Sequence, residues 1–199
     1  MKDVIMVIIT AAIYAVFLHN LVFSGGLGAS EVLRAAQRNS EPLMTSVMVS
    51  LFTTALAVIC RLLESAWLQN TKLAYAWRAA VYGGVLLALY IVVCVVIASL
   101  PLRIKRLLLK RIGMSALNSV VMAVPLLIFR AGENLSWAIG MGLGAGVAFF
   151  LVTLLINSGL HILQQNKAIP PVFSGVPAAL IYTGLLALAF TGFTAEALF

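Results

Sequence analysis

The stretch at residues 79–100, AAVYGGVLLALYIVVCVVIASL, contains no charged side chain. An α-helix needs about 20 apolar residues to cross a hydrocarbon core that is about 30 Å thick. A buried helix of a water-soluble protein is the alternative, but other parts of the chain repeat the same apolar pattern. The stretch therefore predicts a transmembrane helix, and its neighbours must be compatible with lipid.

Six apolar runs follow one another along the chain, near residues 4–23, 43–60, 79–100, 114–129, 135–159 and 176–193. Hydrophobic residues make up 63% of the 199 positions, well above the roughly 45–50% of soluble domains. The runs are apolar on every side and do not alternate with period two, which argues against a membrane β-barrel and favours helices. We expect an all-α membrane protein with six transmembrane helices.

Neither the first apolar run nor the two cysteines indicates a secreted protein. The first run could be a signal peptide, but it lacks a small-residue cleavage site and five more spans follow, so we expect it in the mature protein. Cys60 and Cys94 lie within helical runs, without CxxC spacing or a neighbouring His or carboxylate cluster. We expect both to pack as small hydrophobic residues, with no disulfide and no metal.

Lysine and arginine are distributed unevenly between the two sides of six alternating spans. The segment at 103–111, RIKRLLLKR, has five cations and no acid and is predicted to be a short cytoplasmic loop, which places both termini outside the inner membrane. This topology and anionic lipid headgroups account for the net charge of +7 better than nucleic acid does. The cytoplasmic cations are Arg34, Arg38, Arg103, Lys105, Arg106, Lys110, Arg111 and Lys167, and the others are Lys2, Arg61, Lys72, Arg78 and Arg130.

Two apolar stretches resemble each other, VYGGVLLALY at 81–90 and IYTGLLALAF at 181–190. They share a tyrosine, a glycine and a leucine at equivalent positions, which pairs the third span with the sixth. Residues 1–101 and 102–199 would then be two three-helix repeats, and the odd number of crossings would invert the second relative to the first. Chance similarity between apolar stretches is the alternative.

Polar residues and glycines interrupt spans one and four, which predicts a broken helix in each. Glycine permits backbone angles that other residues resist, and Pro125 would kink the fourth span. Freed backbone groups at membrane depth must be satisfied by protein or by water in a cavity, so the breaks are candidate ion-path positions. Alternatively, the polar groups only satisfy the backbone, and His19 is only hydrogen-bonded within the bundle. The candidates are His19, Asn20, Ser24, Gly25, Gly26, Gly28, Ser30, Asn118 and Ser119.

The glycine-rich segment GMGLGAG at 140–146 contains two overlapping small-xxx-small pairs, Gly140 with Gly144 and Gly142 with Gly146. A nucleotide-binding loop would require a preceding strand, whereas both flanks have the character of membrane helix. We therefore predict close helix packing at this segment.

Three segments together resemble the integral membrane subunits of the Rnf and Nqr respiratory complexes, a family that includes RnfA, RnfE, NqrD and NqrE. PPVFSGVPAALIYTGLLALAFTGF at 170–193 is similar to the RnfA-type ending, and HNLVFSGGLG at 19–28 resembles the segment before the first half-helix. LAVICRLLE at 56–64 is similar to the end of the second helix. The resemblance covers nearly the whole chain and is greatest to the RnfA type.

The resemblance implies a partner and a cofactor. In the family, an A-type and an E-type subunit pair in opposite orientations, and cysteines at their helix breaks hold a [2Fe-2S] cluster between them. Here Ser30 stands at the first cysteine position and Ala123 at the second, so Ala123 joins the candidate positions and no ligand cysteine remains. Alanine has no ligating atom, and clusters require thiolates or histidine.

The sequence thus predicts a membrane subunit of an Rnf/Nqr-type electron-transport complex that moves sodium ions or protons. It would have no redox centre and no catalytic residue of its own, and its partners would be an RnfE-like paralogue, other membrane subunits and lipid. Two alternatives stay open at this point. One is a small-solute or ion transporter on the same inverted-repeat scaffold, and the other is a purely structural subunit.

Overall fold

The computed structural model describes residues 2–37, 42–68, 75–166 and 170–194. Arg38, Lys72 and Lys167, which the sequence places in connections between spans, lie outside these ranges. The described part of the chain consists of helices joined by short turns and contains no strand, which confirms the expected all-α class. Its elements are α1 (Lys2–Ile13), a π-helical turn η1 (Tyr14–Leu18), α2 (Leu21–Gly25), α3 (Ala29–Gln37), α4 (Pro42–Ala66), α5 (Tyr75–Ala98), α6 (Leu102–Ala116), α7 (Ser119–Ala131), α8 (Leu135–Gln165), η3 (Pro171–Phe173) and α9 (Val176–Thr194).

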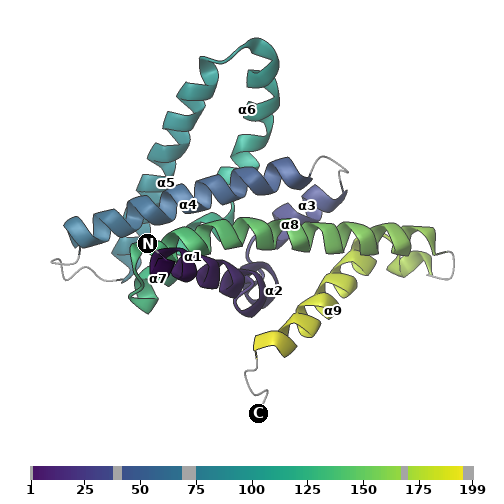
Figure 1. The fold of residues 1–199 in the computed structure, drawn as a ribbon. Coiled ribbons are helices and arrows are strands. Elements are labelled where there is room, and N and C mark those ends of the chain that lie inside the picture. The colour runs from purple at the N-terminus through teal and green to yellow at the C-terminus, as the bar shows by residue number, and fades with distance from the viewer. Residues whose placement is uncertain (1, 38–41, 69–74, 167–169, 195–199) are drawn as a thin grey trace.

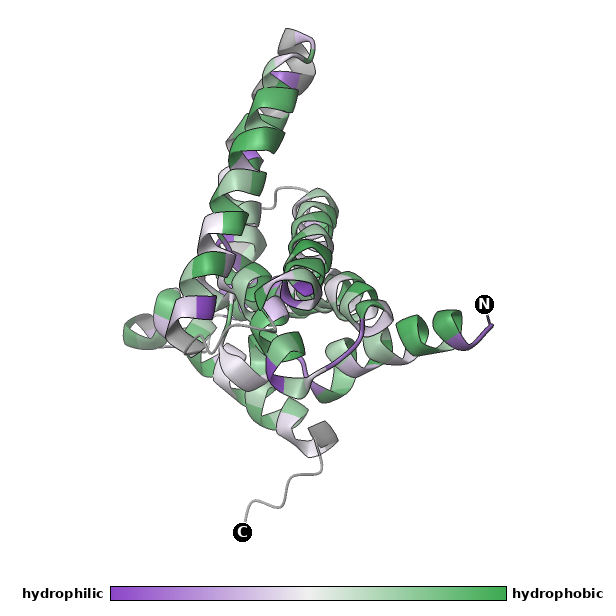
Figure 2. Ribbon diagram, turned by 90° about the vertical axis from the view of Figure 1, so that its left-hand side faces the viewer, coloured by the Kyte–Doolittle hydropathy of each residue, from purple (hydrophilic) through white to green (hydrophobic). Residues whose placement is uncertain are grey.

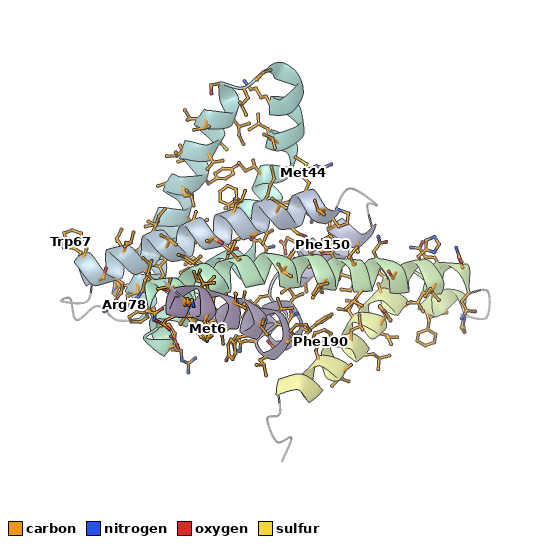
Figure 3. The ribbon with its side chains drawn as sticks, viewed as in Figure 1. Met6, Met44, Trp67, Arg78, Phe150 and Phe190 are labelled. Carbon is orange, nitrogen blue, oxygen red and sulfur yellow. The ribbon has the colours of Figure 1, made fainter. Side chains whose placement is uncertain are left out.

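The long helices α4 and α8 lie side by side and form the centre of the molecule (Figure 1). α1, η1 and α3 also pack on α8, and α7 packs on α4. α9 runs diagonally from the C-terminal part of α8 back towards α2, where Phe190 meets Phe23 with ring centroids 4.4 Å apart (Figure 3). This arrangement brings the first helical segments of the chain against its last helix.

The glycines of α8 explain why its two neighbours come so close. A methyl group added to Gly142 would lie 2.5 Å from the Cα of Thr54 on α4, and one added to Gly144 would lie 2.6 Å from the Ala12 carbonyl oxygen on α1. Gly146 faces α4 in the same way, and Gly140 faces α1. Two small-residue faces of one helix therefore admit two helices, and the close packing predicted for GMGLGAG is confirmed.

Four helical segments within the described ranges are long and apolar enough to cross a membrane, namely Pro42–Ala66, Trp77–Ala98, Arg111–Ala131 and Leu135–Gln165. Val176–Gly192 is apolar but shorter. The first expected span, near 4–23, is interrupted: α1 continues directly into η1, which ends at Leu18, and Asn20 then caps the separate helix α2. The broken helix expected in the first span is therefore present, although the interruption at Asn20 comes before the glycines, and the described ranges do not confirm six spans.

The basic segment 103–111 is part of helix α6, so the prediction of a loop was wrong. The apolar positions Leu108 and Ile112 are one helical turn apart and both pack against the core, which favours a helix over a loop. α5 and α6 form a hairpin that extends away from the α4 and α8 pair, and apolar residues run along it (Figures 1 and 2).

Candidate functional site at the helix breaks

The first break is closed by the side chain of Asn20. Its backbone is extended, with ψ at 99°, and it caps the N-terminus of α2. The carboxamide oxygen accepts hydrogen bonds from the N–H groups of Val22 and Phe23, and the amide nitrogen donates to the Val16 carbonyl at 3.0 Å. An asparagine in this position satisfies N–H groups that a helix start leaves unpaired. Asn20 is only 3% exposed, so these bonds form away from solvent.

His19 follows the π-helical turn just before this cap. Its backbone N–H donates to the Tyr14 carbonyl at 2.8 Å. Its ring stacks on the Tyr14 ring, with centroids 5.7 Å apart and an interplanar angle of 11°. Ser24, one turn further along, donates to the Asn20 carbonyl at 2.7 Å. The first break thus combines a held imidazole, a buried amide and a hydroxyl in a single short segment.

The second break separates α6 from α7 at Leu117 and Asn118. The Asn118 backbone is extended, and its carboxamide oxygen accepts a hydrogen bond from the Val120 N–H at 3.0 Å. Its side chain is buried, and no described residue accepts a hydrogen bond from its amide nitrogen. Pro125 lies inside α7, six positions beyond the helix start, and leaves α7 a single helix. The interruption predicted in the fourth span is therefore present, and asparagine rather than proline marks it.

The two breaks contact each other directly. The N–H of Gly28 donates to the Ser119 hydroxyl at 2.7 Å across a sequence separation of 91 residues. Gly28 has a φ of +73°, and a methyl group on it would lie 2.7 Å from the Asn118 carboxamide oxygen and 2.9 Å from Val120. Only glycine adopts this backbone readily and leaves room for the Asn118 side chain. The segments expected at the two breaks are thus brought together at one point.

The two positions at which the resemblance placed family cysteines are not together. Ser30 is exposed in the first turn of α3, and its hydroxyl donates to the Glu31 carboxylate at 2.8 Å. Ala123 lies four residues inside α7 and lines a cavity with residues of the first break. Ser119, not Ala123, accepts the hydrogen bond that joins the two breaks.

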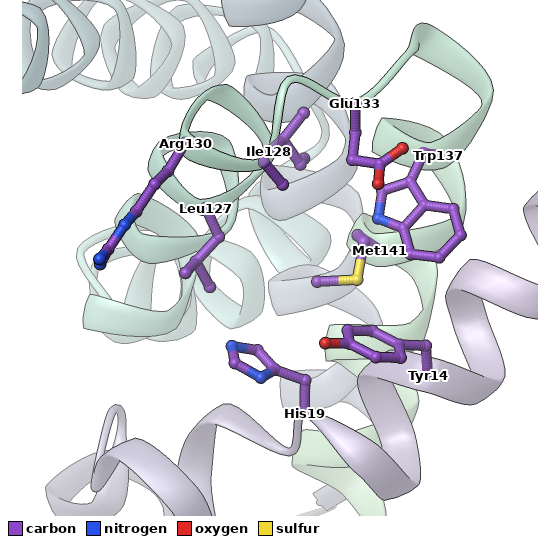
Figure 4. A pocket seen from close by; sticks show the side chains of 9 residues that line it. Tyr14, His19, Leu127, Ile128, Arg130, Glu133, Trp137 and Met141 are labelled. Atoms are coloured by element: carbon purple, nitrogen blue, oxygen red, sulfur yellow. The ribbon is translucent and has the colours of Figure 1, made fainter.

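Two cavities adjoin the first break. One has a volume of about 610 Å³ and lies between η1, α2, α7 and α9, lined by His19, Ser24, Gly25, Ala123 and Thr191 among others. The other is about 350 Å³ and reaches the turn between α7 and α8, where Arg130, Glu133 and Trp137 line it (Figure 4). Gly26 and Ser30 line neither cavity, whereas His19 lines both.

No protein-family model matches the chain. Individual proteins do match it over nearly its whole length. It is 24% identical to the A subunit of the ion-translocating oxidoreductase complex of Rhodobacter capsulatus, over 97% of each chain. It is 26% identical to the A subunit of the Na⁺-translocating ferredoxin:NAD⁺ oxidoreductase complex of Acetobacterium woodii, over 95% of this chain and 97% of that protein. Identity to the A subunit of the ion-translocating oxidoreductase complex of Glaesserella parasuis is 28%, over 98% of this chain and 97% of that protein.

The chain is similar over nearly its whole length to RnfA-type subunits of the Rnf/Nqr family. The family resemblance seen in its three sequence segments is therefore confirmed. The similarity extends through both helix breaks, since each alignment covers nearly all of this chain.

The donor atoms of this chain do not suit an iron–sulfur cluster at the breaks. Cluster iron is held by cysteine thiolates, with histidine as the known substitute. The breaks offer a single imidazole, that of His19, together with hydroxyls and carboxamides, while Cys60 lies in α4 and Cys94 in α5. Within the described ranges, no three His, Cys, Asp or Glu side chains gather as a metal site would require.

The sequence did not predict a buried ionic cluster that the structure contains. Arg78, expected near a membrane surface, forms an ion pair with Glu64, and both side chains are largely buried. The Tyr82 hydroxyl donates to the second Glu64 oxygen at 3.0 Å, and the Arg78 guanidinium lies 4.3 Å from the Phe129 ring centroid. The cluster joins α4, α5 and α7. The sequence did contain a pattern that could have predicted the ion pair. Glu64 lies in the last turn of one span, and Arg78 lies at the start of the next.

Proposed function

We propose that the chain is a membrane subunit of an Rnf-type ion-translocating oxidoreductase complex and that its two helix breaks form part of the ion path. The observation that carries this proposal is the contact between Gly28 and Ser119, which joins two interrupted helices beside a cavity. Its support from comparison is the similarity, over nearly the whole chain, to proteins named as the A subunits of such complexes.

The groups at the breaks suit ion movement better than electron transfer. Neutral hydroxyls, carboxamides and backbone carbonyls solvate a cation or a chain of waters without introducing a buried charge that needs a partner. Ser24, Thr191 and the break at Asn20 provide such groups next to the 610 Å³ cavity. A redox centre would require ligands that these positions lack. Electrons would therefore pass through partner subunits.

The finer topology belongs to the same proposal. Residues 1–101 and 102–199 would be two inverted repeats that together cross the inner membrane six times, with both termini outside. The pseudo-equivalent tyrosines have different environments, since Tyr82 donates to Glu64 whereas Tyr182 packs over Gly159. An RnfE-like paralogue in the opposite orientation would be the neighbouring subunit, sodium ions or protons the cargo, and lipid the remaining contact.

Purification from native membranes tests this proposed membership of a complex. We expect a tagged form of the chain to be isolated with other membrane subunits and with electron-transfer activity that drives ion uptake into vesicles. Isolation as a stable single-component oligomer that moves a solute would instead favour the transporter. Iron analysis and electron paramagnetic resonance on the chain purified alone should detect no cluster, and a reduced-cluster signal there would contradict the assignment of electrons to partners.

Leucine substitutions at the breaks test the ion path. Asn20→Leu and Asn118→Leu should lower ion uptake per electron transferred, because each removes a carboxamide from the break. Asn134→Leu is a matched control, since Asn134 caps α8 at an exposed turn. Unchanged uptake in both break variants, with assembly intact, would support the purely structural subunit.

A further inference from the structure

The two cavities beside the first break share three residues, Tyr14, His19 and Leu127. His19 and Tyr14 lie on one side of the smaller cavity, while Glu133 lies across it from them (Figure 4). The larger cavity extends from these shared residues to Ser24 and Gly25 of α2. The His19 imidazole therefore lines both cavities.

The smaller cavity opens where the chain leaves the apolar part of α7. The apolar segment Arg111–Ala131 ends next to Gly132, which takes a left-handed conformation with φ at +70°, and Asn134 then caps α8. Arg130 and Glu133 belong to this turn and line the cavity. Charged side chains at the end of a span are typical of an aqueous boundary. The smaller cavity thus leads inward from that boundary, and the larger one continues to the helix break.

His19 is held in a fixed position between the chambers. Its backbone N–H donates to the Tyr14 carbonyl, and its ring stacks on the Tyr14 ring. Trp137 of α8 packs against Tyr14 in turn, with ring centroids 5.7 Å apart. The third shared residue, Leu127, cannot exchange a proton. Among the side chains common to both cavities, only the imidazole has two nitrogens, so that one can accept a proton while the other releases one.

We propose that the two cavities form a proton entry route from the α7–α8 turn to the helix breaks, and that His19 passes the proton between them. One ring nitrogen accepts a proton from water in the smaller cavity as the other releases a proton to water in the larger cavity. The ring is neutral before and after this transfer, and a tautomer change resets it. The titratable or charged groups that line the route with His19 are Tyr14, Arg130 and Glu133. This inference rests on the proposed ion-path function.

The chemistry favours protons over sodium ions at this position. Sodium would need several oxygen ligands, whereas the smaller cavity presents an imidazole, an indole, a thioether and a guanidinium together with the Glu133 carboxylate and the Tyr14 hydroxyl. The guanidinium repels both kinds of cation, but a proton moves between waters and an imidazole without the shell of oxygen ligands that sodium needs. The site therefore suits proton transfer.

The test uses the purified assembly in vesicles that contain a pH-sensitive dye, with His19→Gln as the variant. We expect redox-driven proton uptake to fall by about tenfold or more, because glutamine cannot relay a proton. His161→Gln is the matched control, because His161 is exposed on α8 and bonds to Gln165 outside both cavities.

The outcomes separate the two proposals. Normal proton uptake by His19→Gln would overturn the role of His19 and leave the proposed membership of the complex intact. If His19→Gln loses uptake of radioactive sodium while its proton uptake is unchanged, the assignment of protons to this route is overturned. If the parent assembly moves neither ion while it transfers electrons, the proposed ion-path function itself fails.

Labelling gives a second readout that does not depend on turnover. In a Cys60→Ser, Cys94→Ser background, Ala123→Cys should react with a small charged thiol reagent added from the α7–α8 side. His19→Trp should slow this reaction by about tenfold while Ala131→Cys, in the smaller cavity, reacts at its usual rate. Equal rates at Ala123→Cys with and without His19→Trp would show that the two chambers do not communicate past His19.

Discussion

Asn20 and Asn118 perform the same local task with different results. Both are buried, both have extended backbones, and both cap a helix after an interruption. Asn20 uses both ends of its carboxamide, so its break is closed within the residues from Val16 to Phe23. Asn118 uses its oxygen alone for the cap, and its side chain lies against Gly28 of the other break.

The difference shows which break is self-contained and which depends on a distant segment. The first break would keep its shape through hydrogen bonds within about two turns of chain. The second is supported by the segment leading into α3, through the hydrogen bond from Gly28 to Ser119. We therefore expect substitutions at the first break to act mainly on local helix stability, and substitutions near Asn118 to act on the contact between the breaks.

Gly28→Ala should have the largest effect, because the added methyl group would meet both Asn118 and Val120 and the backbone has a positive φ. Overpacking and backbone strain together should lower the free energy of unfolding by about 3 kcal/mol. Gly26→Ala is the matched control, since Gly26 also has a positive φ but no described atom lies within 4 Å of the added group. It should lose only about 1 kcal/mol. Unfolding titrations in mixed micelles measure both variants. Equal losses in Gly28→Ala and Gly26→Ala would show that Gly28 does not pack tightly against Asn118.

Asn20→Leu should rank second, because it removes three hydrogen bonds from a buried position. Loss of the cap and of the bond to the Val16 carbonyl should cost about 2–3 kcal/mol. Asn134→Leu, at an exposed cap, should cost about 1 kcal/mol. Thermal unfolding in detergent measures both, and an Asn20→Leu midpoint as high as that of Asn134→Leu would contradict a closed, self-satisfied break.

Ser119→Ala should have a smaller effect, since it removes the acceptor for the Gly28 N–H at the contact. An N–H left without a partner should cost about 1–2 kcal/mol. Ser115→Ala is the control: its hydroxyl is buried shortly before the break and has no partner among the described residues. That variant should be neutral within about 0.5 kcal/mol. Hydrogen exchange at the Gly28 amide should accelerate in Ser119→Ala alone, and unchanged exchange would argue against this bond.

Asn118→Ser should have the smallest effect on stability. Serine keeps a cap acceptor for α7 and removes the amide nitrogen that has no acceptor in the described ranges, so the change should stay within about 0.5 kcal/mol. Asn20→Ser should cost about 1 kcal/mol, because it loses the bond to Val16. Comparing the two midpoints tests the asymmetry between the caps, and a loss in Asn118→Ser as large as that in Asn20→Ser would remove it.

Much of the fold was predictable from local pattern. The apolar runs identified the helices of α4, α5, α8 and α9, and the spacing of Gly140 to Gly146 identified the most tightly packed helix. The polar interruptions marked both breaks, although the stop at Asn20 comes before the glycines. The basic segment at 103–111 was assigned wrongly, because charge density was given more weight than the helical spacing of Leu108 and Ile112.

The site was predictable as a set of residues but not as a geometry. The sequence singled out Gly28, Asn118 and Ser119, yet it did not indicate that Gly28 donates to Ser119 or that His19 borders two cavities. The pairing of Glu64 with Arg78 was missed because an ion pair between two helices depends on their relative rotation. Position within a run of apolar residues does not reveal that rotation.

The sequence by itself determined that the chain is helical, suited to lipid, related to RnfA-type subunits and without cysteines at its helix breaks. These properties depend on composition and on the spacing of residues within a few helical turns, and both can be read without knowing how the helices pack. The tertiary structure alone decided which residues join the two interrupted helices, which asparagine keeps a spare donor and which histidine borders both cavities. Those outcomes depend on how α3, α7 and α9 pack around α8, because contacts between residues far apart in the chain are set by the joint packing of whole helices.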